Sequence, residues 1–161
     1  MNKTNFVIEP GKQVVVITRI FDAPRELVFK TMMDPKLVPQ WWGPRYLTTT
    51  IDKMDVRPGG SWRFVQRAPD GGEHAFHGVY HTIEQPARVV QTFEYEGVPG
   101  HVALETATLE EIDGKTHWTT TSVFQSVEDR DGMAQSGMES GVIESYERLD
   151  EVLAKLAPRE K

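Results

Sequence analysis

The chain has five histidines and no cysteine, so imidazole and carboxylate groups are the side chains that could hold a metal ion. His77 and His81 fall on one face of a predicted strand, where four residues at about 3.3 Å each separate them by roughly 13 Å. One zinc ion with bonds of about 2.1 Å cannot be held by both. His74 points to the opposite face from His77. We therefore predict no metal site.

The sequence contains no H-E-x-x-H, no G-x-S-x-G and no Walker loop. Gly59-Gly60 and Gly71-Gly72 lie between predicted strands and not before a helix, which indicates hairpin turns and not phosphate sites. An acid–base site built from Arg63, Tyr80 or Glu105 stays open, although most carboxylates here fit solvated strand faces and turns. Polar groups in a cavity more often orient a ligand than transform it. We therefore assign no catalytic residue and no cofactor.

Large aromatic side chains are the stronger candidates, because they suit the wall of a site for an apolar molecule. In Trp41-Trp42-Gly43-Pro44, we expect Trp41 to point inward and Trp42 to pack outward on its neighbours. Alternation along the strands places further aromatic residues on shared faces, and methionines add adaptable apolar surface. A filled core explains any one of these residues equally well, so that interpretation stays open. The predicted ligand-binding residues are Trp41, Trp42, Trp62, Phe64, Phe76, Tyr80, Phe93, Trp118, Thr120, Met133 and Met138.

Seven segments have the composition and the turn signals of strands. The first is followed by Asp22-Ala23-Pro24 and a short helix, and Asp34-Pro35 begins a second short helix that Pro44 ends. The segment 73–84 is ambiguous, because Phe76 and Tyr80 share one face while Val79 and Ile83 share the other; a bulge would reconcile them. The predicted strands are 14–21, 48–56, 61–67, 73–84, 88–95, 102–112 and 115–124.

From Met138 the apolar residues recur at helical spacing, which predicts a long amphipathic helix. Ser136 and Glu139 can form a capping box near its start. Gly137 and Gly141 each cost about 1 kcal/mol in a regular helix relative to alanine. We therefore favour a helix that makes room for a ligand or a strand here, over one that frays or bends.

The composition is that of one domain over residues 1–161, with a core over about 14–156. A net charge of −6 argues against a nucleic-acid module and against an electrostatic anchor on a membrane. No stretch approaches the roughly 20 apolar residues that a membrane span needs, and the first eleven residues hold no apolar signal region. We expect a cytoplasmic protein without nucleic-acid or membrane partners.

Six motifs, in this order, carry a resemblance over about residues 14–156. They are Phe21-x-Ala23-Pro24-x-x-x-Val28-Phe29, Asp34-Pro35, Trp41-Trp42-Gly43-Pro44, Asp55-x-Arg57-Pro58-Gly59-Gly60-x-Trp62, His77-Gly78-Val79-Tyr80, and Gly137-Met138-Glu139-Ser140-Gly141 through Tyr146-Glu147-Arg148-Leu149. Together they resemble the activator-of-heat-shock-protein-ATPase-like (AHSA-type) branch of the SRPBCC, or START-like, helix-grip superfamily.

The resemblance implies an α+β fold of the START/Bet v-like type, β-α-α-β6-α, in which a seven-stranded antiparallel sheet grips a long C-terminal helix. It also implies an apolar cavity between sheet and helix, which in this superfamily takes a lipid, sterol, polyketide or other hydrophobic molecule. Some members are cyclases or aromatases. The eukaryotic namesake stimulates a chaperone ATPase with an additional N-terminal domain, for which the residues before Val14 leave no room.

Three functions are therefore open. The first is a non-enzymatic, cytoplasmic binding protein for a small hydrophobic or aromatic ligand, held in a cavity between the sheet and the C-terminal helix. The second is a cyclase-, aromatase- or hydrolase-type enzyme that acts in the same cavity. The third is a stress-related module that contacts a chaperone, and a homodimer is also open. We predict the first.

Overall fold

Residues 2–157 form one antiparallel sheet of eight strands in this computed structural model, in the order β1-β2-β8-β7-β6-β5-β4-β3, together with three α-helices and one 3-10 turn. The strands are β1 (Asn5–Val7), β2 (Val14–Phe21), β3 (Thr48–Met54), β4 (Ser61–Arg67), β5 (Glu73–Glu84), β6 (Arg88–Tyr95), β7 (Val102–Ile112) and β8 (Lys115–Val123). The helical elements are α1 (Arg25–Met33), η1 (Val38–Gln40), α2 (Val127–Ala134) and α3 (Met138–Leu156).

The seven predicted strands are confirmed, and β1 is an eighth that the sequence did not predict. Its three residues pair antiparallel with β2, with Phe6 opposite Ile17. Three residues are too few to display an alternating pattern, so β1 carried no signal. The Asp113-Gly114 turn between β7 and β8 has positive φ at both residues, as the tightest hairpins require.

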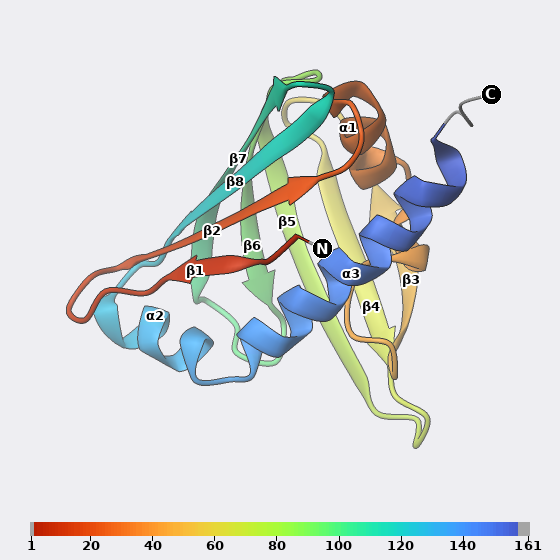
Figure 1. The fold of residues 1–161 in the computed structure, drawn as a ribbon. Coiled ribbons are helices and arrows are strands. Elements are labelled where there is room, and N and C mark those ends of the chain that lie inside the picture. Colours follow the sequence, from red (N-terminus) through yellow and green to blue (C-terminus); the bar gives the residue numbers. More distant parts are fainter. Residues whose placement is uncertain (1, 158–161) are drawn as a thin grey trace.

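Helix α3 lies diagonally across one face of the sheet, which we call the inner face (Figure 1). Inward residues of β2 and β8 form a continuous core with α3, and Phe21 and Leu149 are completely buried in it. Helix α1 covers one end of this core, and α2 lies beside the turn between β1 and β2 at the other (Figure 1). The helix-grip architecture is therefore confirmed.

The segment that joins α1 to β3 is less helical than predicted. Only the 3-10 turn η1 forms there, and not a second α-helix from Asp34 onward. Pro39 lies inside it and has no backbone N–H, so the segment cannot build a regular ladder of helical hydrogen bonds.

Helix α2 was not predicted, because it holds few apolar residues. Its N-cap is Ser126, whose Oγ accepts a hydrogen bond from the backbone N–H of Asp129 at 3.0 Å.

The start of α3 also differs from the predicted capping box. Gly137 is the N-cap, with a left-handed φ of 89° and no side-chain cap, while Ser136 bonds back to Met133. A Cβ added at Gly137 or at Gly141 meets nothing within 4 Å, so no strand approaches α3 closely here. The left-handed turn into the helix explains Gly137, whereas Gly141 lies inside α3 and borders open space.

The ambiguity in β5 is resolved by a bulge between Tyr80 and Thr82. Before the bulge, Phe76 and Tyr80 face inward with Gly78; after it, Ile83 faces inward opposite Val89. The extra residue moves the second half of the strand onto the other phase of the alternation.

None of the helices within residues 2–157 is long and apolar enough to cross a membrane.

Candidate functional site

Four polar side chains lie next to one another across the inner face, on four neighbouring strands. Tyr80 pairs with Gln91, Gln91 with Glu105, and Glu105 with Ser122. The Oγ of Ser122 donates to Glu105 Oε2 at 3.2 Å, and Nε2 of Gln91 donates to Glu105 Oε1 at 3.4 Å. We call this set, Tyr80, Gln91, Glu105 and Ser122, the polar row.

The carboxyl group of Glu105 is the chemically unusual member of the polar row. Burial raises its pKa to about 7, and the hydrogen bonds from Ser122 and Gln91 only partly oppose that rise. No cationic side chain among residues 2–157 forms an ion pair with it. Near neutral pH this group therefore exchanges readily between an acid that donates a hydrogen bond and a carboxylate that accepts one.

A first aromatic cluster, Trp42, Trp62, Phe64, Phe76 and Phe93, lies on one side of the polar row. The ring centroids of Trp62 and Phe64 are 4.8 Å apart, those of Phe76 and Phe93 are 5.5 Å apart, and Trp42 lies within 5.2 Å of both Phe64 and Phe76. Phe93 is two residues from Gln91 on β6 and has the same inward direction. The cluster thus borders the polar row directly.

A second aromatic cluster, Phe21, Trp118 and Tyr146, lies on the opposite side. Its edge-to-face ring contacts have centroid distances between 5.6 and 6.5 Å. Trp118 Nε1 donates to the hydroxyl of Tyr146 at 2.9 Å, which connects β8 to α3. Burial is the largest cause of the raised pKa of Tyr146, and the charge of Glu105 adds to it. Tyr146 therefore lies close enough to Glu105 to sense its ionisation.

Several inward-pointing side chains on central strands keep accessible surface. Phe93, Glu105, Trp118 and Thr120 are half-buried, although each has a strand on both sides and points toward α3. The nearby core residues Phe21 and Leu149 are fully buried. The inner face is therefore closed to solvent near Phe21, whereas side chains over the middle of the sheet stay partly accessible.

Trp62 provides a further polar group on this face, outside the polar row. Its side chain is 2% exposed, and its Nε1 has no hydrogen-bond partner within the described part of the chain. A Cβ on the neighbouring Gly78 would lie 2.7 Å from that nitrogen and would collide with the carbonyl oxygen of Thr92. Glycine at this position lets the indole lie against β5, with its N–H left unpaired.

The structure brings most of the predicted ligand-binding residues together. Trp42 packs on Phe64 and Phe76, so it faces the sheet and not outward. Trp41 is buried, but its Nε1 donates to the carbonyl of Thr31 at 3.2 Å, which directs it to α1. The residues on the inner face are Trp62, Phe64, Phe76, Tyr80, Phe93, Trp118 and Thr120, while Met133 and Met138 are partly buried beside the core.

Sequence reasoning missed Gln91 and Tyr146 as site residues and left Glu105 as one of several open candidates. The signal for Glu105 was present, because alternation from the buried residues Ala103 and Leu109 places it on the inner face. The structure separates the three residues considered for an acid–base site, Arg63, Tyr80 and Glu105. Arg63 lies on the outer face, away from Tyr80 and Glu105.

On the outer face, Arg63 forms a two-pronged ion pair with Glu96, at 2.8 and 3.0 Å. His77 Nδ1 also lies 2.9 Å from Glu96, and the Arg63 hydrogen bond is the main cause that lowers the pKa of Glu96 to about 2. Within residues 2–157 no group of three or more histidine, aspartate or glutamate side chains could hold a metal ion. This outer cluster is a charged network on a solvated face.

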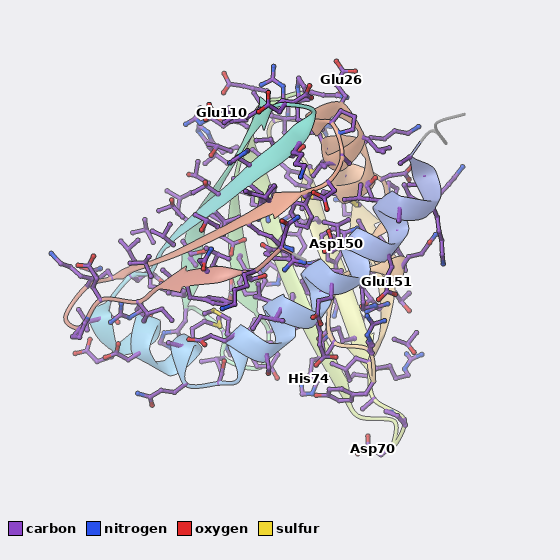
Figure 2. The ribbon with its side chains drawn as sticks, in the orientation of Figure 1. Glu26, Asp70, His74, Glu110, Asp150 and Glu151 are labelled. Atoms are coloured by element: carbon purple, nitrogen blue, oxygen red, sulfur yellow. The ribbon has the colours of Figure 1, made fainter. Side chains whose placement is uncertain are left out.

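A separate hollow of about 470 Å³ lies beside the C-terminal half of α3 and is lined mainly by charged residues. Arg19 and Asp150 form an ion pair there, and Arg45 pairs with Glu151; Asp150 and Glu151 are adjacent on α3 (Figure 2). Its lining is too charged for the apolar cavity that was predicted. The lining residues are Asn2, Arg19, Asp22, Arg45, Glu147, Asp150, Glu151, Leu153 and Ala154.

A family model described as "Activator of Hsp90 ATPase homolog 1-like protein" matches residues 22–154. No curated protein matches the chain in sequence.

Solved structures resemble the whole fold. A solution NMR structure from Arthrobacter aurescens is 28% identical with a TM-score of 0.86, and the match covers 94% of this chain and 91% of that one. A crystal structure from Rhodobacter sphaeroides is also 28% identical at a TM-score of 0.86, covering 93% and 98%. A protein of the dynemicin biosynthetic locus is 21% identical with a TM-score of 0.69 and matches 91% of this chain over 49% of its own length, which is a likeness of fold.

Proposed function

This chain belongs to the family of Activator of Hsp90 ATPase homolog 1-like proteins, and we propose that it binds a small hydrophobic or aromatic molecule on the inner face of the sheet, under α3. Ligand sites in proteins are mostly apolar, with a few polar groups that converge on the ligand and orient it. The polar row between two aromatic clusters has this composition.

The observation that carries the proposal is the carboxyl group of Glu105 between two aromatic clusters. A filled core rarely contains a carboxyl group without a cationic partner, because its desolvation is costly. Trp62 adds a buried N–H without a hydrogen-bond partner in the described residues. A ligand that meets both groups, and that covers the half-buried rings of Phe93 and Trp118, accounts for all of them.

NMR chemical-shift perturbation tests this proposal with 2-phenylethylamine, 2-phenylethanol, indole and octanoate as probes. The four tryptophans give separate indole N–H signals, and we expect those of Trp62 and Trp118 to move. Trp41 is an internal control, because its N–H is bonded to Thr31 on the side of α1. Saturable shifts at Trp62 and Trp118 with little change at Trp41 support the proposal. Shifts at none of the four, or only at exposed residues, contradict it.

An enzyme that acts on the same face is a second candidate, and the pKa of Glu105, about 7, favours it. A general acid or base works best when its pKa lies near the operating pH. For an enzyme, Glu105→Gln should remove turnover of any substrate that the protein converts, while binding stays within a few-fold. Turnover that survives Glu105→Gln together with Tyr80→Phe contradicts this candidate.

A contact with a chaperone is the function that the family description names, and it is the third candidate. The outer face exposes Leu104 and Val123, which lie opposite one another on β7 and β8. A measurable stimulation of Hsp90 ATPase activity that Leu104→Glu abolishes would favour it. No stimulation at saturating protein would exclude this role.

A further inference from the structure

We propose that the polar row is the subsite for a positively charged amino group, so that the ligand is an aromatic amine in its protonated form. This inference rests on the proposed function and specifies its ligand class. Glu105 would pair with the ammonium group, and the two aromatic clusters would surround the apolar body of the molecule.

Glu105 has hydrogen-bonding capacity that the protein does not use. An ionised carboxylate has about four acceptor positions, whereas only Ser122 and Gln91 donate to this one, at 3.2 and 3.4 Å. Both partners are neutral, so they orient the carboxylate without neutralising it. An ammonium group brings up to three N–H donors and the missing positive charge.

Arg19, a strong cation on the inner face, already has a carboxylate partner. Arg19 lies on β2, opposite Trp118, and its guanidinium group binds Asp150 and, at 2.7 Å, the hydroxyl of Thr4. It also lies 5.5 Å from the ring centre of Phe21. Arg19 is therefore paired with Asp150 and not with Glu105, and a cationic ligand would supply a positive partner for the Glu105 carboxylate.

The aromatic surroundings also favour a cation. The faces of aromatic rings carry partial negative charge and attract ammonium groups within about 6 Å. Trp118 and Tyr146 lie on one side of the polar row and Phe93 on the other. A negatively charged ligand would meet the Glu105 carboxylate and these ring faces at once, which disfavours it. The structure thus ranks amines first, neutral alcohols second and carboxylates last.

The test compares three probes that share a phenyl ring and differ in one group: 2-phenylethylamine, 2-phenylethanol and phenylacetate. Dissociation constants are measured at pH 8 by titration calorimetry, where Glu105 is largely ionised and the amine is protonated. We expect the amine to bind at least tenfold more tightly than the alcohol, and phenylacetate to bind most weakly. This comparison on the unmodified protein needs no variant.

Two variants assign the preference to its residue. Glu105→Gln keeps the shape and removes the charge, and it should bring the amine and the alcohol to within twofold of each other. Glu110→Gln is the matched control on the same strand, because Glu110 is exposed and points away from the inner face (Figure 2). It should retain the full preference.

The outcomes separate this inference from the proposed function. Equal binding of amine and alcohol, or a preference that survives Glu105→Gln, overturns the amine subsite while ligand binding stands. Tighter binding of the alcohol assigns the polar row to neutral hydroxyl groups and also overturns the amine subsite. If none of these probes, nor indole or octanoate, perturbs the inner face, both the inference and the proposed function are wrong.

Discussion

Glu105 concentrates most of the unusual chemistry of this molecule in one side chain. Its folded-state pKa of about 7 lies above its ordinary value of 4.5, so the folded protein holds a proton that the unfolded chain releases. The contribution of Glu105 to stability is then highest below about pH 4.5, falls as the pH rises from there through 7, and levels off above it. The difference corresponds to roughly 3 kcal/mol.

We predict that Glu105→Gln removes this part of the pH dependence. The free energy of unfolding, measured by urea denaturation, should favour the variant over the original protein by about 3 kcal/mol more at pH 8 than at pH 4. Every other titrating group is common to both proteins and cancels in that comparison. Glu110→Gln, on the exposed side of β7, should show no such change. Parallel stability curves for Glu105→Gln and the original protein would contradict the account of Glu105.

At the scale of elements, α3 is held over the sheet by the ion pair of Asp150 with Arg19. The side chain of Arg19 is 2% exposed, so removing Asp150 leaves a buried charge without its carboxylate. We predict that Asp150→Ala costs about 3 kcal/mol of stability. Thermal or urea unfolding measures this loss.

The next residue supplies the control for that prediction. Glu151 pairs with Arg45, and both side chains are more than half exposed, at 55% and 51%. Exposed ion pairs contribute little, because water screens them. Glu151→Ala should therefore leave the unfolding midpoint almost unchanged. Equal losses for Asp150→Ala and Glu151→Ala would show that burial of Arg19 is not what makes the first pair important.

Gly78 on β5 determines where the Trp62 indole lies. Gly78→Ala would drive a methyl group into the Thr92 carbonyl and the Trp62 indole, and we predict a loss of about 1–3 kcal/mol. Gly132→Ala is the contrasting variant, because Gly132 lies in α2 with nothing within 4 Å of an added Cβ; it should gain up to about 1 kcal/mol. A neutral Gly78→Ala variant with an unmoved Trp62 indole signal would contradict this packing.

The elements differ in how well the sequence predicts them. Strands such as β6 and β7 are long, alternate clearly and end at strong turns, so their bounds were predicted to the residue. Helix α2 and strand β1 exist through tertiary contacts and one Ser126 cap, which leave little periodic signal. The aromatic residues of the site were found from alternation, but the polar row required the register of four strands, which no single strand reveals.

At the scale of the whole molecule, the two faces of the sheet have different properties. The inner face gathers aromatic rings and the polar row under α3, whereas the outer face carries charged and threonine-rich rows such as that around Arg63 and Glu96. Side chains in the middle of the inner face are more accessible to solvent than those at its end near Phe21. This asymmetry supports our proposal that the domain binds a ligand on its inner face.

The most direct measurement of that claim is a set of intermolecular NOEs between the protein and a bound probe. The probe is whichever of 2-phenylethylamine, 2-phenylethanol, indole and octanoate gives the largest chemical-shift changes. We predict NOEs from its protons to the side chains of Phe93 and Trp118, and to Tyr146 on α3. NOEs confined to the outer face around Leu104 and Val123, or to the charged hollow beside Asp150, would contradict the account.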